Sequence, residues 1–132
     1  MSNSYFDKQA ATWDDNPTRV QLAGAVASFI IQTVLPNNEF TVLDYGCGTG
    51  LVSFLLSSMV KSVCAADISD GMLEQIRKKI KSQNVNNIEA LNFDITKSKP
   101  LDKKFDLIVS AMAMHHIEEP IAAITKLTAL LK

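Results

Sequence analysis

The chain has 132 residues, which allows one domain with a hydrophobic core of moderate size. With 47% hydrophobic and 20% charged residues it is not a disordered chain, and its net charge of −1 gives no field that favours nucleic acid or an anionic membrane. There is no secretory signal and no apolar run as long as a membrane span, and two cysteines suggest no disulfide framework. We therefore expect a cytoplasmic protein without membrane or nucleic-acid partners.

Apolar residues recur at helical spacing between Pro17 and Pro36, which predicts an N-terminal helix buried on a wide face. Beyond it, apolar runs alternate with helical patterns. Strands are predicted over 40–45, 63–67, 88–93 and 105–109, and helices over 49–59, after Ser69 and from Pro120 onward. This alternation predicts an α/β domain, in which a Rossmann-like parallel sheet carries helices on both faces.

A polar residue lies at or next to the carboxyl end of each predicted strand. These residues are Asp44, Asp67, Asp94 and Ser110. Because the carboxyl ends of parallel strands open on one edge of the sheet, we expect a ligand site there.

The most informative segment is the turn that follows Asp44, in which Gly46, Gly48 and Gly50 alternate. Such a turn lets the backbone lie against a ligand where a Cβ would collide. A dinucleotide fingerprint would need a sixth-position glycine, and that position is Leu51. The carboxylate of Asp44 would repel a pyrophosphate and attract a cationic ligand such as S-adenosylmethionine. An NAD-dependent oxidoreductase is accordingly a disfavoured alternative.

Two neighbours of the turn have alternative interpretations. Asp67 follows Gly46 by about twenty residues at the end of the second strand, where an acid accepts hydrogen bonds from ribose hydroxyls. Its alternative role is a helix cap, which Ser69 or Asp70 can supply instead. Cys47 lies within the turn without a neighbouring base, so we interpret it as a small residue filling a tight turn and not as a nucleophile.

Five segments of the chain form a combined pattern in this order: YFDKQAATWDD, VLDYGCGTG, AADIS, NFDI and FDLIVSAMAMHHIEEP. Together they resemble the small-molecule branch of the S-adenosylmethionine-dependent methyltransferases, in particular those of ubiquinone and menaquinone biosynthesis. The resemblance implies strand order 3-2-1-4 and S-adenosylmethionine as cofactor. It also implies cofactor-binding roles for ten residues: Trp13, Asp44, Gly46, Cys47, Gly48, Asp67, Ile68, Phe93, Asp94 and Ser110.

Within that set the resemblance assigns particular roles. Asp44 and Gly46 would hold the methionine end, and Asp67 the ribose. Adenine would pack on Ile68, and its amino group would meet Asp94, with Phe93 beside it. Ser110 would lie near the methyl-transfer centre, and Trp13 would close over the cofactor.

The chemistry needs mainly alignment of the acceptor with the activated methyl group, and His115 or His116 is a candidate base. A structural role for each histidine is an equal alternative. Enzymes that methylate exocyclic amines of nucleobases carry an Asn or Asp followed by Pro-Pro and an aromatic after the fourth strand. This chain has Ser110-Ala111-Met112-Ala113 there, so a small-molecule acceptor is expected.

We expect one domain over residues 1–132, with an N-terminal helical segment over 1–36 and a cofactor-binding core over 40–132. Relatives continue into a fifth strand, so we expect an incomplete sheet whose fourth strand is exposed at its edge. A fragment of a longer enzyme, or self-association through this edge, would explain it. The alternative function is a non-catalytic cofactor-binding domain that stabilises or activates a partner subunit.

Overall fold

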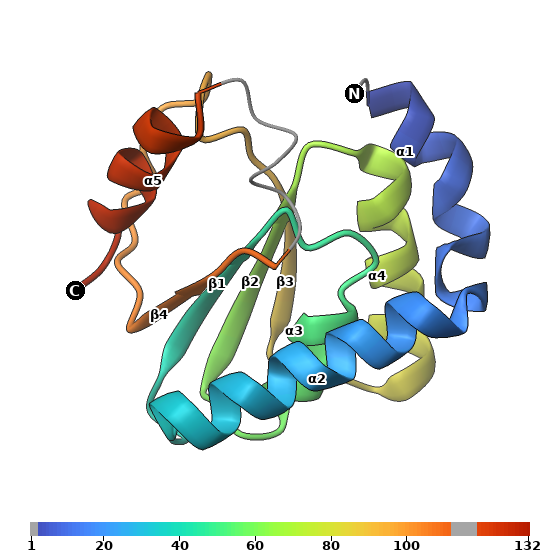
Figure 1. Cartoon of the computed structure of the whole chain (residues 1–132), viewed down its shortest axis with the longest axis horizontal. Helices are drawn as coiled ribbons and strands as arrows, with labels where there is room; N and C mark the ends of the chain where they lie inside the picture. The colour runs from blue at the N-terminus through green and yellow to red at the C-terminus, as the bar shows by residue number, and fades with distance from the viewer. Residues whose placement is uncertain (1–2, 112–118) are drawn as a thin grey trace.

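The computed structural model describes residues 3–111 and 119–132 (Figure 1). The N-terminal part contains helix α1 (Asn3–Gln9), the 3-10 helix η1 (Ala10–Asp15) and helix α2 (Pro17–Val34). Strands and helices then alternate as predicted. They are β1 (Thr41–Tyr45), α3 (Leu51–Ser57), β2 (Ser62–Asp67), α4 (Asp70–Gln83), β3 (Ile88–Asn92), β4 (Leu107–Val109) and α5 (Pro120–Thr128).

The four strands form one parallel sheet in the order β3-β2-β1-β4, which confirms the predicted fold class and strand order. In the register, Asp44 of β1 lies opposite Ala65 of β2 and Val109 of β4. Asp67 pairs with Asn92 of β3, one step beyond the end of β1. The carboxyl ends of the strands therefore lie at one edge of the sheet, around the turn that follows β1.

The fourth strand is shorter than the predicted 105–109, because the backbone of Phe105 forms hydrogen bonds with the C-terminal residues and not with β1. Its N–H donates to the carbonyl oxygen of Leu130 at 2.8 Å, and its carbonyl accepts from the N–H of Lys132 at 3.0 Å. Phe105 thus forms an isolated parallel bridge with Leu131. Only from Asp106 onward, whose N–H donates to Thr41, does this segment join β1.

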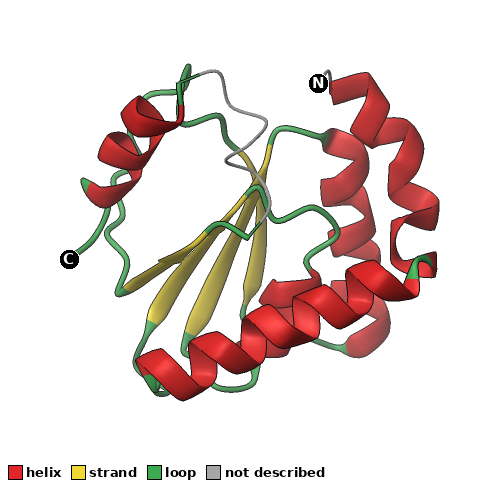
Figure 2. Cartoon of the chain, in the orientation of Figure 1, coloured by secondary structure: helices red, strands yellow, loops and turns green. Residues whose placement is uncertain are grey.

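Two apolar layers enclose the sheet. On one face α2, α3 and α4 pack against the strands around Val42, Val63 and Val109. On the other face α5 and the segments flanking β3 and β4 pack on Leu43 and Tyr45. In Figure 2 the helices flank the yellow strands on both sides, with α5 at the β4 end (Figure 1). This two-sided burial explains why the strands are nearly all apolar.

Helix α2 differs from the prediction of a wide buried face. Only Ala23 and Ala27 are buried, whereas Leu22 is 43% and Phe29 is 68% exposed. The helix contacts the core through these two alanines and through the partly buried Val26, Ile30 and Ile31, and no further layer among the described residues covers its outer side. Apolar spacing alone did not distinguish these two faces. None of the helices in the described ranges is long and apolar enough to cross a membrane.

Candidate functional site

The turn between β1 and α3 has the left-handed backbone that its glycines permit. Gly46, Gly48 and Gly50 have φ angles of 69°, 58° and 82°, which side-chain-bearing residues rarely adopt. The N–H groups of Gly46 and Cys47 donate to the carbonyl oxygen of Ala66 at 2.8 and 3.0 Å. The Gly48 N–H donates to the Asp67 carboxylate at 2.8 Å, and the Gly50 N–H to the Cys47 carbonyl at 3.0 Å. Four amides of the turn are therefore engaged within the protein.

This arrangement distinguishes the turn from a phosphate-binding loop. A phosphate site at a strand-to-helix turn depends on free backbone N–H groups that point at the anion. Here those of Gly46, Cys47 and Gly48 already have acceptors, and one acceptor is a carboxylate. The turn is thus poorly suited to a pyrophosphate. A dinucleotide is therefore disfavoured as the ligand of this turn.

Asp44 is a buried carboxyl group at the strand mouth, with only 2% of its surface exposed. Its Oδ2 accepts a hydrogen bond from the hydroxyl of Ser53, itself buried in α3, at 2.6 Å. The pKa of Asp44 is raised to about 6, mainly by burial and in part by the nearby charge of Asp67, while hydrogen bonds from Ser53 oppose the shift. The site therefore holds a carboxyl group that a cationic ligand would help to ionise.

Asp67 links the glycine turn to the start of α4. Its Oδ2 accepts from the Gly48 N–H at 2.8 Å, and its Oδ1 accepts from the Ser69 N–H at 2.9 Å. The helix cap is Ser69, whose hydroxyl accepts from the Met72 N–H at 3.2 Å. Asp67 is thus not the cap. It orders the turn through one oxygen and the following loop through the other.

The other predicted cofactor residues lie around the same edge of the sheet in different environments. Ile68 is half-buried in the loop between β2 and α4. The ring of Phe93 is 3% exposed and packs edge-to-face on Tyr45, so it belongs to the core and does not line an open surface. Asp94 is half-buried and accepts from the N–H and hydroxyl of Thr96 at 2.9 and 2.5 Å.

Ser110 follows β4 and has a buried hydroxyl without a hydrogen-bond partner among the described residues. Buried hydroxyls normally have partners, and an exception calls for an explanation. The resemblance implies that this residue lies near the methyl-transfer centre. His115 and His116 lie outside the described residues, so the predicted base is not placed here.

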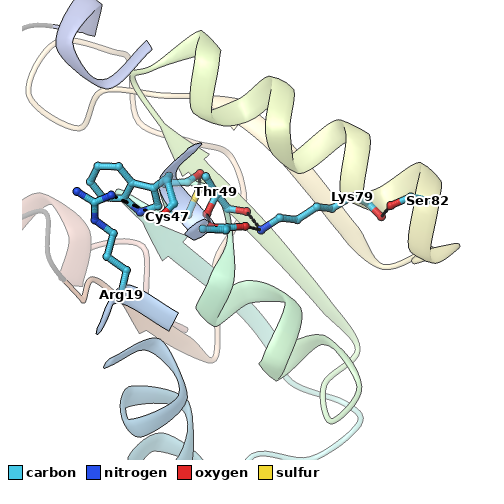
Figure 3. Close-up of polar contacts among 8 residues, drawn as sticks. Arg19, Cys47, Thr49, Lys79 and Ser82 are labelled. Atoms are coloured by element: carbon cyan, nitrogen blue, oxygen red, sulfur yellow. Dashed lines mark hydrogen bonds and ion pairs between the residues drawn. The ribbon is translucent and has the colours of Figure 1, made fainter. Parts of the chain in front are cut away.

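Trp13 of η1, for which the resemblance implies a position over the cofactor, has its indole edge beside Gly48 of the glycine turn. Its Nε1 is 3.9 Å from the position that a Cβ on Gly48 would take. The guanidinium of Arg19 stacks on the indole at 3.6 Å from the ring centroid, and its Nη1 donates to the Trp13 carbonyl at 3.4 Å. Figure 3 shows Arg19 against this ring, close to the turn that carries Cys47 and Thr49.

Cys47 behaves as the sequence interpretation expected. Burial raises the pKa of its thiol well above the ordinary value, and the carboxylates of Asp44 and Asp67 raise it further. Its Sγ donates to the neighbouring Gly48 carbonyl at 3.5 Å, and the side chain packs against the core. The group therefore stays a thiol and is no nucleophile at neutral pH.

The sequence analysis missed three residues that fasten the N-terminal segment to the turn. Asp14 of η1, Thr49 of the glycine turn and Lys79 of α4 are joined by two hydrogen bonds and an ion pair. Asp14 lies in the YFDKQAATWDD segment that supported the resemblance, whereas Lys79 belongs to none of the matching segments. No local pattern signalled their contact.

The fold and this acid-lined glycine turn define the class of Rossmann-like domains that bind a ligand at the carboxyl ends of parallel strands. Residues 42–132 match the family model described as a methyltransferase domain, and the chain belongs to that family. The family expected from the sequence is thereby confirmed.

Individual relatives agree with this assignment. An uncharacterised methyltransferase of Schizosaccharomyces pombe is 31% identical, over 98% of this chain and 60% of the relative. A ubiquinone biosynthesis O-methyltransferase of Histophilus somni is 29% identical, over 96% of this chain and 57% of the relative. The crystal structure of an S-adenosylmethionine-dependent methyltransferase from Clostridium acetobutylicum superposes with a TM-score of 0.70 at 28% identity, covering 80% of this chain and 45% of that one. The chain thus spans less than two thirds of the length of each of these relatives.

Proposed function

We propose that this domain binds S-adenosylmethionine at the glycine turn and transfers its methyl group to a small-molecule acceptor. The observation that carries the proposal is the turn itself. Its amides are engaged internally, and the carboxyl groups of Asp44 and Asp67 lie beside it. That set of groups suits a ligand with an ammonium and a sulfonium, and it does not suit a pyrophosphate.

The residues fit the two halves of such a ligand. The ionised form of Asp44 would attract the charged methionine end, next to Gly46. Asp67 would accept from ribose hydroxyls, since each of its oxygens has further lone pairs beyond the amide that it accepts. Ile68 would offer apolar contact to the adenine ring, with Asp94 at its polar edge. The buried hydroxyl of Ser110 would find its missing partner at the ligand.

The cofactor supplies an already activated methyl group, so the chain's own work is alignment and exclusion of water. Trp13 would cover the ligand on the side of the N-terminal segment. Where the acceptor must lose a proton, His115 or His116 is our candidate base. Because neither is placed here, these assignments rest on the sequence alone.

A small molecule is the acceptor that we favour. The relative named for ubiquinone biosynthesis supports this choice, as does the Ser110-Ala111-Met112-Ala113 sequence after β4, which lacks the Pro-Pro signature of nucleobase methylation. A non-catalytic domain that serves a partner subunit is the second candidate. It is favoured by the outer edge of β4, which among the described residues is paired only at Phe105.

The first test is titration calorimetry of the purified chain with S-adenosylmethionine, S-adenosylhomocysteine and NAD. We expect both sulfur ligands to bind and NAD to give no signal. Binding of NAD alone would contradict the proposal. If the sulfur ligands bind but the chain transfers no methyl group to candidate quinol or phenol acceptors, the second candidate is favoured.

A further inference from the structure

Three residues from separate elements meet at one carboxylate beside the glycine turn (Figure 3). The Asp14 Oδ1 accepts from the Thr49 hydroxyl at 2.5 Å, and its Oδ2 lies 2.6 Å from the Lys79 ammonium. The same ammonium donates to the Thr49 backbone carbonyl at 2.9 Å. A closed triangle of contacts therefore joins η1, the turn and α4.

This triangle differs from an ordinary surface ion pair. Thr49 is 1% exposed, and the side chains of Lys79 and Asp14 are 22% and 32% exposed. The Arg77–Glu74 pair on the same α4 is longer, at 3.6 Å, and both of its side chains are more than half exposed. Charge-assisted hydrogen bonds that are short and partly shielded from water are the stronger kind.

The residue positioned by this triangle is Trp13, which precedes Asp14 in η1. Its indole edge faces the Gly48 backbone, where a bulkier residue would come within 3.9 Å, and its face is covered by Arg19. The segment has a second attachment at Asp7, whose Oδ1 accepts from the Ser69 hydroxyl at 2.6 Å and the Gly71 N–H at 2.8 Å. Trp13 also packs edge-to-face on Phe6 of α1, with 6.1 Å between the ring centroids. Loss of the Asp14 contacts would therefore loosen the attachment of Trp13 to the turn, while α1 stays attached and the ring contacts of Trp13 remain.

We propose that Asp14, Thr49 and Lys79 form a latch that positions Trp13 over the glycine turn and sets the rate at which the ligand enters and leaves. The inference rests on the proposed function, because it takes the ligand to be S-adenosylmethionine or its product. A closed latch slows both association and dissociation of the ligand, because the ligand must pass the indole on its way in and on its way out. The latch residues are positioning residues and are assigned no chemical step.

The test uses the single tryptophan of the chain as its reporter. Stopped-flow fluorescence of Trp13 would follow S-adenosylhomocysteine binding to Asp14→Asn and Lys79→Met. Adjacent exposed residues provide matched controls, Asp15→Asn and Lys78→Met. We expect association and dissociation rates to rise by about tenfold in the latch variants, with a smaller change in Kd, and to be unchanged in the controls. Lys79→Arg should retain slow exchange because it restores the cation.

Unchanged rates in both latch variants would overturn the proposal. A faster dissociation with an unchanged association rate would also overturn it, because it would indicate the simple loss of a contact. If Asp14→Asn does not fold by circular dichroism, Lys79→Met decides the outcome.

Failure of the proposed function would be recognised separately. If the unmodified chain binds no S-adenosylhomocysteine, the ligand assignment is wrong, and the latch is then tested in the free protein. Acrylamide should quench Trp13 more strongly in Asp14→Asn than in Asp15→Asn. Equal quenching would show that Asp14 does not hold the indole in place.

Discussion

Asp44 and Asp67 are the same residue type at the ends of adjacent strands, and their surroundings make them chemically different. Asp44 is enclosed by the sheet and α3 and has one hydroxyl donor, Ser53. Asp67 accepts from the backbone N–H groups of Gly48 and Ser69. Burial disfavours the charged form of Asp44, and the hydrogen bonds from Ser53 only partly oppose this effect. In the free protein, the carboxyl group that is unfavourable to ionise therefore lies at the ligand site.

This cost predicts a pH dependence of stability. The pKa of Asp44 is raised from 3.8 to about 6 in the folded chain, so between these values the folded state holds more proton than the unfolded state. The free energy of unfolding should therefore fall as pH rises through this window, by roughly 2–3 kcal/mol from this group, and the loss should be complete above about pH 6. Urea denaturation of Asp44→Asn should lack that component, because its amide stays neutral.

The matched control is Asp102→Asn, an exposed aspartate that should retain the parental pH slope. In the unmodified chain, affinity for S-adenosylmethionine should rise with pH over the same range, since only the ionised Asp44 attracts the cation. Identical pH slopes for Asp44→Asn and the unmodified chain would show that this carboxyl group does not titrate as described.

At the scale of elements, α1 packs closely on α4 because Gly71 leaves room for it. A Cβ on Gly71 would lie 2.7 Å from the Asp7 Cα and 3.0 Å from its carbonyl oxygen, which are backbone atoms that cannot move alone. The Asp7 carboxylate in turn accepts from the Ser69 hydroxyl and the Gly71 N–H, which lowers the pKa of Asp7. The start of α4 is therefore built to receive the N-terminal segment.

Two glycines in helices offer a matched comparison. Gly71→Ala should lower the free energy of unfolding by roughly 1–3 kcal/mol, because the new methyl group displaces α1. Gly24→Ala in α2 meets no atom within 4 Å and should raise it by roughly 0.5–1 kcal/mol through helix propensity. Urea denaturation and limited proteolysis of the N-terminal segment would measure both. A stabilising Gly71→Ala would mean that α1 does not pack on α4 in this way.

The sequence predicted elements wherever burial is two-sided. Apolar runs ending in Asp44 and Asp67 identified β1 and β2, because a central parallel strand leaves no face for polar residues. For α2 the sequence predicted the helix but not which side is exposed, since a helix with Phe29 on its outer side has the same apolar spacing as one buried all round. It also could not pair Asp14 with Lys79, because a contact between side chains from separate elements leaves no periodic signal.

At the scale of the molecule, the sheet ends at β4. By strand alternation, Leu107 and Val109 direct their backbone N–H and C=O groups outward, as Phe105 does toward Leu130 and Lys132. Among the described residues no strand pairs with those outward groups. Such an edge is a template for another strand, and its three residues limit how strongly it can pair.

We therefore expect the 132-residue chain to self-associate through β4. In sedimentation velocity, the sedimentation coefficient should increase with protein concentration. Leu107→Pro should weaken the association, because proline removes one outward N–H and is tolerated on edge strands. A chain that sediments as a monomer at every concentration would contradict this expectation. So would a Leu107→Pro variant that folds and associates as before.

The N-terminal segment also fixes an order of assembly during synthesis. Asp7 is bonded to Ser69, 62 residues later in the chain, and Thr41 to Asp106, 65 residues later. At ribosomal speeds, 62 residues take roughly 3–12 s, during which α1 has no surface on which to dock. The glycine turn itself is bonded to Ala66 and Asp67, which precede Ser69 by only a few residues. The turn and the docking site of α1 are therefore completed almost together, and the N-terminal segment stays undocked until both have been synthesised.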